Sequence, residues 1–215
     1  MMVKLEGKRC IVIGGGAVGE RKTEALLEAG ADVTVISPST TERLSAWTEA
    51  GRIRLMRREY CSGDTAGAAL IIAATNRAEV NETVLADASR EGVFWIDVAS
   101  RPEASTFIMP AVIRRGDLVI AVSTSGASPT LAIRIRDKLM EEYGAEYAAY
   151  LHFLREYRLK VRQLVKDANM RQSLMRELLQ ANSHERIRSG AWKAWSLQAI
   201  ERLEEWTDRG GADKK

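Results

Sequence analysis

The sequence has few of the residues that build disulfide frameworks or metal centres. Its 215 residues include only two cysteines, Cys10 and Cys61, and two histidines, His152 and His184. Two cysteines are too few for a disulfide framework, and neither they nor the histidines have the spacing of metal ligands. We therefore expect no metal site, and we expect Cys10, which lies in an apolar stretch, to be a small buried hydrophobic residue.

Long hydrophobic runs are also missing. No apolar segment approaches the roughly 20 residues that a membrane-spanning helix needs. The N-terminal stretch MMVKLEGKRC contains no apolar core of a signal peptide. Hydrophobic residues make up 46% and charged residues 28% of the chain, as in a globular protein with one large or two small domains. We therefore expect a cytoplasmic protein without a membrane partner.

Before Pro110, short apolar segments alternate with helix-type patterns. The run 68–75 is apolar almost throughout, as expected for a parallel strand that is buried on both faces. The alternation predicts an α/β fold with a parallel, doubly wound sheet and right-handed crossovers. The predicted strands are 8–15, 32–37, 53–60, 68–75 and 93–99, and the predicted helices are 19–31, 41–51 and 78–92.

After Pro110 the pattern changes. Residues 111–124 are predicted to form two strands around an Arg-Gly-Asp turn, and 128–144 a helix with Pro129 in its first turn. From about Glu146 the chain is nearly all helical. The leucines at helical spacing predict its amphipathic faces: Leu151, Leu154, Leu159, Leu164, Leu174, Leu178 and Leu179.

The segment CIVIGGGAVGERK has the spacing G-x-G-x-x-G directly after a strand and at the start of a helix. The first glycine permits a tight turn, the second lets a pyrophosphate approach the backbone, and the third lets helix and strand pack closely. The helix N-terminus offers N–H groups and partial positive charge to the phosphates. This context predicts a Rossmann-like dinucleotide site, and the alternative is a purely structural glycine-rich turn. The predicted cofactor-binding residues of the loop are Gly14, Gly15, Gly16, Ala17, Val18 and Gly19.

One part of the dinucleotide pattern is missing. About 20 residues after the glycines, a carboxylate is expected to close the second strand and hold the ribose hydroxyls. Ser37 and Pro38 stand there instead, and Asp32 precedes the strand. Since no arginine stands at this point to bind a 2′-phosphate, we predict NAD rather than NADP, with Ser37 and Pro38 in the cofactor site.

The segment AATN ends the fourth predicted strand at the carboxyl edge of the sheet, where ligands bind in such folds. Thr75 and Asn76 are therefore predicted to contact the nicotinamide half of the cofactor. Both residue types also cap helices well, so an N-cap of the following helix is the alternative.

Together these segments resemble the precorrin-2 dehydrogenases, including the N-terminal part of the siroheme synthases. The stretches that carry the resemblance are VIGGGAVGERK, AGADVTVISP, IIAATN followed by VN, TFIMPAVIRRGDL and VSTSGASPTLAIRIRDKL. They run in the family's order from about residue 4 to 140 and are more specific than the glycine spacing alone. The remaining helical part fits the family in type but carries no motif of it.

The resemblance implies an NAD-dependent oxidoreductase that converts precorrin-2 to sirohydrochlorin on the route to siroheme. It also implies a homodimer and three parts of the chain. These are a Rossmann-like NAD-binding domain at 1–112, a small α+β dimerisation region at 113–145 and a C-terminal helical domain at 146–215. Some members of the family also insert iron or cobalt into the product.

The loop DVASRPEASTFIMPA, residues 97–111, departs from the family's pattern. Many members have an aspartate two residues before the proline, where this chain has Ser100, and Asp97 stands where the family usually has asparagine. Serine is a poor base and a poor iron ligand, so we expect a dehydrogenase without efficient chelatase activity. A bifunctional dehydrogenase–ferrochelatase is the first alternative. NAD carries the oxidation step, and the candidate catalytic residues are Asp97, Ser100 and His152, with Asp97 or His152 as proton acceptor.

Precorrin-2 carries many carboxylates, which implies cations and N–H groups around it. Arg101 and Arg114 are candidates because guanidinium groups bind carboxylates in a bidentate manner, with ion pairs inside the protein as the alternative. The turn STSGASP offers Thr124, Ser125 and Ser128 to an acidic arm of the substrate. A plain N-cap by Ser128 before the following proline is the alternative.

The C-terminal segment is basic, with 14 Lys and Arg against 9 Asp and Glu in residues 151–215. Such a segment faces nucleic acid, an acidic small molecule or only solvent. A redox sensor that binds NAD and DNA is the second alternative, but no clear helix-turn-helix pattern is present, and we expect no nucleic-acid partner. Trp192, Trp195 and Trp206 form either an aromatic floor for a flat ligand or an ordinary helix packing face.

Overall fold

The computed structural model describes residues 3–181 and 184–208. The chain divides into two compact units, Met1–Met109 and Pro110–Lys215. The first predicted boundary, after residue 112, lies close to this division. The second, after residue 145, falls inside the second unit at the start of a helix. Residues 209–215 of the predicted helical domain lie outside the described residues, and none of the helices described is long and apolar enough to cross a membrane.

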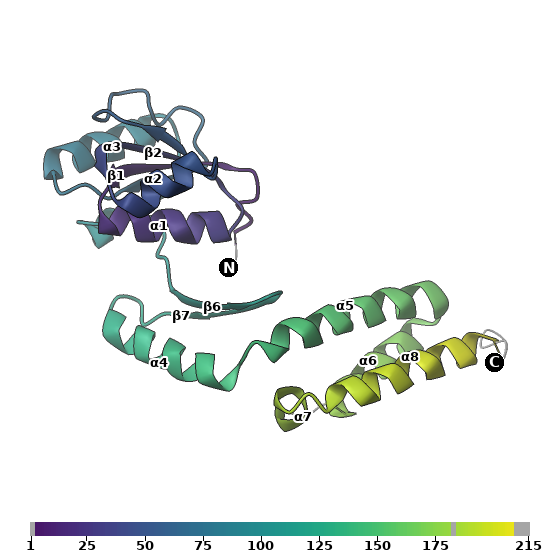
Figure 1. Ribbon diagram of the computed structural model, residues 1–215. Coiled ribbons are helices and arrows are strands. Elements are labelled where there is room, and N and C mark those ends of the chain that lie inside the picture. The colour runs from purple at the N-terminus through teal and green to yellow at the C-terminus, as the bar shows by residue number, and fades with distance from the viewer. Residues whose placement is uncertain (1–2, 182–183, 209–215) are drawn as a thin grey trace. The chain divides into compact units, whose positions relative to one another are not determined.

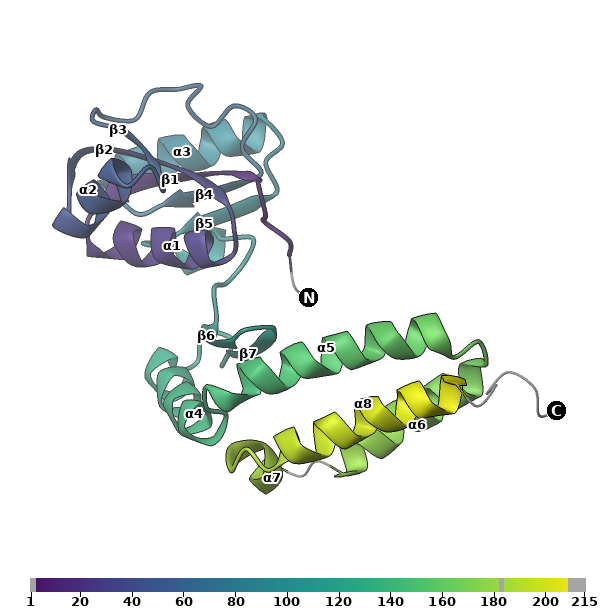
Figure 2. The same ribbon diagram turned by 45° about the vertical axis from the view of Figure 1, so that its right-hand side comes forward.

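The first unit is built on a five-stranded parallel sheet with the strand order β3-β2-β1-β4-β5. Helices α1 and α2 cover one face of the sheet and α3 the other (Figures 1 and 2). The predicted doubly wound α/β sheet is therefore confirmed. Its elements are β1 Arg9–Gly15, α1 Ala17–Glu28, β2 Asp32–Thr40, α2 Glu42–Glu49, β3 Arg54–Met56, β4 Leu70–Ala73, α3 Ala78–Arg90 and β5 Trp95–Val98.

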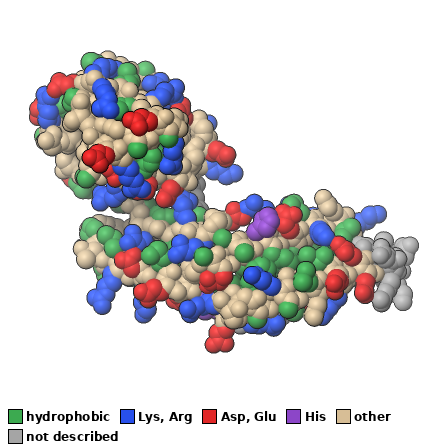
Figure 3. Space-filling model, in the orientation of Figure 1, with side chains coloured by type: hydrophobic (Ala, Val, Ile, Leu, Met, Phe, Trp, Pro, Cys, Tyr) green, Lys and Arg blue, Asp and Glu red, His purple; other side chains and the backbone are tan. Residues whose placement is uncertain are grey.

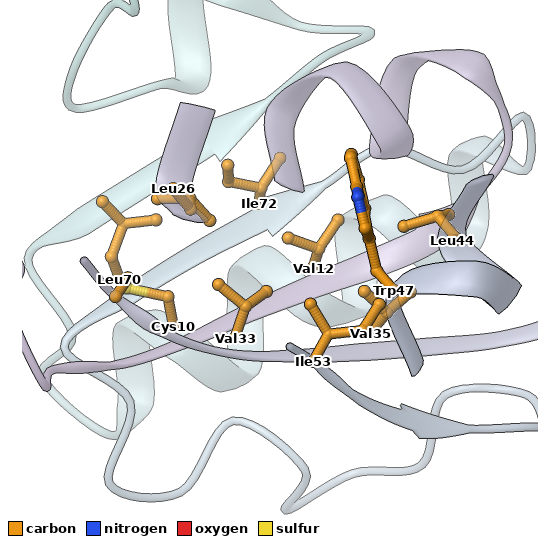
Figure 4. Close-up of a cluster of buried hydrophobic side chains, with 11 residues drawn as sticks. Cys10, Val12, Leu26, Val33, Val35, Leu44, Trp47, Ile53, Leu70 and Ile72 are labelled. Carbon is orange, nitrogen blue, oxygen red and sulfur yellow. The ribbon is translucent and has the colours of Figure 1, made fainter. Parts of the chain in front are cut away.

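The core of this unit consists of two hydrophobic clusters, one on each face of the sheet. Successive side chains of a strand point to opposite faces, so Cys10 and Val12 of β1 pack in the cluster that includes Trp47 of α2 (Figure 4). Ile11 and Ile13 pack in the other cluster. The prediction for Cys10 is confirmed, since it is fully buried, and burial raises the pKa of its thiol to about 11.

The third strand is shorter than predicted. It ends at Met56 rather than continuing to Tyr60. Arg58 donates two hydrogen bonds of 2.7 Å to the Asp64 carboxylate, and the backbone N–H of Cys61 donates to the same carboxylate at 2.8 Å. These bonds close a turn, so the backbone after Met56 leaves the sheet.

Two hydroxyl side chains complete the free edge of β5. The backbone N–H groups of Ile96 and Val98 donate to Thr106 Oγ1 and Ser105 Oγ, each at 2.9 Å, and Thr106 N–H donates to the Ile96 carbonyl at 2.8 Å. The loop 99–104, which contains the 3-10 turn Pro102–Ala104, is therefore anchored to the sheet at both ends.

The second unit begins with the antiparallel hairpin β6 Ala111–Arg115 and β7 Leu118–Val122 around the predicted Arg-Gly-Asp turn. The predicted helix follows as α4 Pro129–Glu142. The remaining helices, seen in Figure 1, are α5 Glu146–Leu164, α6 Ala168–Ala181, α7 His184–Arg188 and α8 Trp192–Asp208.

The buried face of α5 is mainly aromatic. Tyr147, Tyr150, Phe153, Tyr157 and Val161 are buried at helical spacing, whereas the predicted face was based on leucines. Three of those leucines are exposed: Leu159, Leu164 and Leu179. The prediction is confirmed for Leu178, which is fully buried, and for Leu154 and Leu174, which pack against the same core cluster. It is wrong for the three exposed leucines, because leucine spacing alone does not tell which side of a helix meets the neighbouring helices. Exposed hydrophobic side chains on this unit are visible in Figure 3.

Candidate functional site

The turn between β1 and α1 has glycine where a side chain would collide with backbone. Gly14 has φ +112, and a Cβ there would lie 2.4 Å from the Ala74 carbonyl oxygen. At Gly19, a Cβ would lie 2.0 Å from the Gly14 carbonyl oxygen. These two glycines therefore serve the close packing of strand, turn and helix.

Gly16 differs from its neighbours. A Cβ at Gly16 would meet no heavy atom within 4 Å, and the backbone there has φ −79 and ψ −174, which any residue adopts. Packing inside the protein does not explain a glycine here. Close approach of a ligand to the backbone does, because a pyrophosphate needs the space that a side chain would occupy.

The first turn of α1 can receive an anion. Gly16 is the N-cap residue and provides no side-chain cap, so the first N–H groups of the helix have no side-chain partner at this end. Free N–H groups and the helix dipole together favour a phosphate at such a position. The residues present therefore fit the pyrophosphate of a dinucleotide.

A pocket of about 570 Å³ lies at the carboxyl ends of the parallel strands. It extends from the end of β2 across the glycine loop to the segments that follow β4 and β5. Nine of the ten predicted cofactor-binding residues line it, and Gly19 packs behind the loop instead. The lining residues are Ile13, Gly14, Gly15, Gly16, Ala17, Val18, Ile36, Ser37, Pro38, Ser39, Glu59, Tyr60, Ala74, Thr75, Asn76, Arg77, Val80, Ala99 and Ser100.

The second strand brings no charge to this pocket. Its lining residues are Ile36, Ser37, Pro38 and Ser39, and the Ser37 hydroxyl donates to the Ser39 carbonyl at 2.7 Å. Glu59 and Tyr60, which were not predicted as site residues, reach the pocket from the turn after β3. The Tyr60 hydroxyl donates to Asp87 at 2.7 Å, which together with burial raises the pKa of Tyr60.

A hydrogen-bonded network joins the segments after β4 and β5. Asn81 of α3 is 2% exposed and connects Thr75 with Ser100. The alternative that Thr75 or Asn76 is the N-cap of α3 is wrong, since Arg77 occupies that position without a side-chain cap. Asn81 was not predicted as a site residue, although the VN pair in the matching stretches contains it.

Asp97 is buried in an ion pair. Its carboxylate is bonded to Lys22 of α1, and the two side chains are 10% and 16% exposed. Ser105 Oγ lies 3.4 Å from the other carboxylate oxygen. Strand alternation explains the placement, because Ile96 and Val98 face the α3 side of the sheet and Asp97 therefore faces α1. Asp97 is not among the residues that line the pocket.

Arg101 is held by carboxylates of its own unit. Its guanidinium is bonded to Glu82 and, at 3.2 Å, to Glu103. The alternative of ion pairs inside the protein is therefore the arrangement found for Arg101. Since its side chain is 45% exposed, these pairs contribute little to stability.

The other predicted residues belong to the second unit. His152 is exposed on α5 and Arg114 lies in β6. In the turn before α4, the Ser128 hydroxyl accepts from Leu131 N–H at 3.2 Å, so the N-cap alternative is confirmed.

Two further residues shape this turn. Thr124 Oγ1 lies 2.9 Å from the Ser128 carbonyl oxygen and also accepts from Ser128 N–H at 3.1 Å. Ser125 has φ +52, an uncommon conformation for a residue other than glycine.

The tryptophans of the helical part belong to its core. Trp192 is 6% exposed and packs against Tyr150 and Phe153, and Trp195 packs against the same cluster. The packing-face alternative is confirmed for these two tryptophans. The side chain of Trp206 lies outside the described residues. No group of three or more His, Cys, Asp or Glu suited to hold a metal occurs within 3–181 and 184–208.

Comparison with known proteins agrees with this geometry. A family described as putative NAD(P)-binding matches residues 1–111, and one described as sirohaem biosynthesis protein, central, matches residues 115–141. The chain belongs to the family of precorrin-2 dehydrogenases and siroheme synthase N-terminal domains. The resemblance seen in the sequence and the nicotinamide-dinucleotide cofactor are thereby confirmed, whereas the roles of single residues stay predictions.

The relatives include a protein that is covered almost completely and proteins that are much longer than this chain. A solved structure titled "SirC, precorrin-2 dehydrogenase" superimposes with a TM-score of 0.78 and 28% identity, covering 95% of this chain and 98% of that one. The siroheme synthase of Nitrosococcus oceani is 33% identical over 190 residues, which are 88% of this chain and 40% of that protein. The siroheme synthase of Chromobacterium violaceum is 33% identical over 100% of this chain and 44% of its own length. The chain thus spans about two fifths of these curated relatives.

Proposed function

We propose that the protein catalyses the NAD-dependent dehydrogenation of precorrin-2 to sirohydrochlorin in siroheme biosynthesis. The observation that carries the proposal is the open space at Gly16 above the N-terminus of α1, in a pocket that continues to Ser100. The nearly complete superposition on a precorrin-2 dehydrogenase supports the substrate.

In this reaction the residues of the chain bind the cofactor and the substrate and orient them. The N–H groups of α1 would hold the pyrophosphate, and Thr75 and Asn76, which line the same pocket, would contact the nicotinamide half. NAD supplies the hydride acceptor when bound. Because the Asp97 carboxylate is held by Lys22 and lies outside the pocket lining, we propose that the released proton leaves to water rather than to Asp97.

We propose NAD rather than NADP as the physiological cofactor. The lining residues from β2 offer hydroxyl and backbone groups to a ribose, and none of these four residues is a cation that would bind a 2′-phosphate. Glu59 adds a carboxylate to the pocket wall, although it is paired with Arg77 at 2.7 Å.

We also propose that the protein acts as a cytosolic homodimer. Helix α4 packs on β6 and β7, yet Leu131, Ile133, Ile135 and Met140 are 48%, 45%, 39% and 42% exposed. Leu131 and Ile135 lie one turn apart on one side of the helix, and Ile133 and Met140 lie on the opposite side. Exposed apolar side chains gathered on one element are typical of an interface. Replacement of Ile135 by Asp should convert a dimer to a monomer in light scattering at micromolar concentration. A parent protein that is monomeric would refute the proposal.

The activity is tested anaerobically with purified protein, enzymatically made precorrin-2 and either NAD or NADP. We expect the absorbance of sirohydrochlorin and NADH to rise together with NAD, and more slowly with NADP. Adding Fe²⁺ or Co²⁺ tests chelatase activity, and Ser100→Asp tests whether the missing carboxylate limits it. Failure of the parent protein to turn over precorrin-2 with either cofactor would refute the proposed function.

A further inference from the structure

Asn81 uses its side-chain amide to connect two loops of the pocket. Its Oδ1 accepts from the backbone N–H of Thr75 at 3.3 Å and lies 2.8 Å from Thr75 Oγ1, whose single proton can go to this oxygen or to the Arg77 carbonyl at 3.0 Å. Its Nδ2 donates to the Thr75 carbonyl and to Ser100 Oγ, each at 3.1 Å. The hydrogen-bonding capacity of a residue that is 2% exposed is therefore fully used.

The backbone of Thr75 determines the orientation of the Asn81 side-chain amide. A backbone N–H can only donate and a carbonyl can only accept. Because Asn81 meets both groups of Thr75, its oxygen must face the N–H and its nitrogen must face the carbonyl. The nitrogen therefore also faces Ser100, and the assignment does not depend on the usual ambiguity of asparagine orientation.

The role of the Ser100 hydroxyl follows from this orientation. Since Asn81 Nδ2 has no lone pair to offer, Ser100 Oγ must accept from it. The hydroxyl proton of Ser100 then has to point elsewhere, and the contact with Asn81 is the one side-chain hydrogen bond of Ser100 found among the described residues. Ser100 is exposed and lines the pocket, so its proton is available to a ligand.

We propose that Asn81 is a positioning residue that presents the Ser100 hydroxyl as a hydrogen-bond donor to a carboxylate arm of the substrate. The inference rests on the proposed function, which supplies a polycarboxylate. The neighbouring Arg101 is bonded to Glu82 and Glu103 and is not among the residues that line the pocket, whereas Ser100 is. An aspartate at position 100 would also accept from Asn81 but would offer no proton, so serine gives the pocket a hydrogen-bond donor where aspartate would give it an acceptor.

A double-mutant cycle on Asn81 and Ser100 tests the proposal. Asn81→Asp keeps the size of the side chain and the bond from Thr75 N–H, but it replaces the amide donor by an acceptor, which changes the contact with Ser100 and also removes the bond to the Thr75 carbonyl. The Ser100 proton should then turn toward the new carboxylate and away from the pocket. Ser100→Ala removes the proton directly. Asn169→Asp is the matched control, since it makes the same chemical change at an exposed position of α6.

The Kd of precorrin-2 without NAD is the primary measurement, and KM and kcat are the second. We expect Asn81→Asp and Ser100→Ala each to raise the Kd and KM about 10-fold, as for loss of one hydrogen bond to a charged group. The double variant should bind precorrin-2 no more weakly than the weaker single variant, and the rise in Kd should be larger for precorrin-2 than for NAD. The proposal would be overturned if the Kd of precorrin-2 in the double variant rose about 100-fold, which is the product of the two single effects. It would also be overturned if the variants raised the Kd of NAD instead.

A measurement without substrate keeps the inference testable if Asn81→Asp does not fold. In ¹⁵N-labelled protein, the side-chain amide signal of Asn81 should exchange slowly and should shift in Ser100→Ala. If the signal exchanges rapidly and does not shift in Ser100→Ala, the proposed contact is overturned. Absence of turnover in the parent protein would instead reject the proposed function, while the Kd of precorrin-2 and the amide signal still decide the inference.

Discussion

Replacement of Gly16 by alanine separates the ligand role of the glycine loop from its structural role. An alanine Cβ at this position meets no atom within 4 Å. The backbone already has a conformation that alanine adopts, so lower freedom of the unfolded chain should stabilise the variant by about 0.4–1 kcal/mol. Alanine is a poorer N-cap than glycine and costs a similar amount. We therefore expect the free energy of unfolding to change by less than about 0.5 kcal/mol.

The same methyl group should interfere with NAD. It would point into the space that the pyrophosphate needs beside the first turn of α1, and the phosphates would lose their bonds to the N–H groups. Loss of one such contact corresponds to at least about 1.4 kcal/mol, or a 10-fold higher Kd. Isothermal titration of NAD measures the affinity, and urea denaturation followed by circular dichroism measures the stability.

Gly19→Ala is the matched comparison. Its Cβ would lie 2.0 Å from the Gly14 carbonyl oxygen, far inside van der Waals contact. Helix α1 must then move away from β1, which costs about 1–3 kcal/mol as in other overpacked cores. A lower melting temperature should accompany any loss of NAD affinity in this variant. If Gly16→Ala binds NAD with the affinity of the parent protein, the pyrophosphate does not lie at this loop and the assignment of the pocket is refuted.

Three further predictions concern stability. Lys22→Met should lower the free energy of unfolding in urea by about 2–3 kcal/mol, because it leaves Asp97 buried without its cation. Adding Asp97→Leu should restore most of this loss. If the single and the double variant are equally stable, the ion pair is contradicted. The hydrogen bond from Tyr60 holds the pKa of Asp87 below its ordinary value, so this stabilisation is complete above the unfolded pKa of about 3.9 and is lost as the pH falls below it. Asp87→Asn should therefore lose about 2 kcal/mol at pH 7 and less at pH 3, as measured by urea denaturation at the two pH values. Ser128→Ala should lose about 1 kcal/mol in thermal unfolding, since it removes the N-cap of α4, and an unchanged transition would show that this cap is not needed.

Short-range patterns in the sequence predicted much of the fold. The parallel sheet, the glycine turn and the hairpin around Arg-Gly-Asp depend on residues close together in the chain, and all three are found. Errors occurred where a choice depended on distant partners. The strand after Ile53 ends early because Asp64 holds Arg58 and the backbone of Cys61, and α5 buries its tyrosines rather than Leu159.

The sequence alone determined that a dinucleotide site follows the first strand, because a tight turn and close helix packing require glycine whatever surrounds them. Only the tertiary structure decided which partners the polar residues at the end of β5 and in the loop after it contact. Asp97 faces Lys22 on one side of the sheet, and Ser100 receives a hydrogen bond from Asn81 on α3. These contacts join residues that are far apart in the chain, and no local pattern or residue type specifies which partner folding brings near. Burial thus leaves the candidate base Asp97 in an ion pair, and hydrogen bonding makes Ser100 Oγ an acceptor for the Asn81 amide.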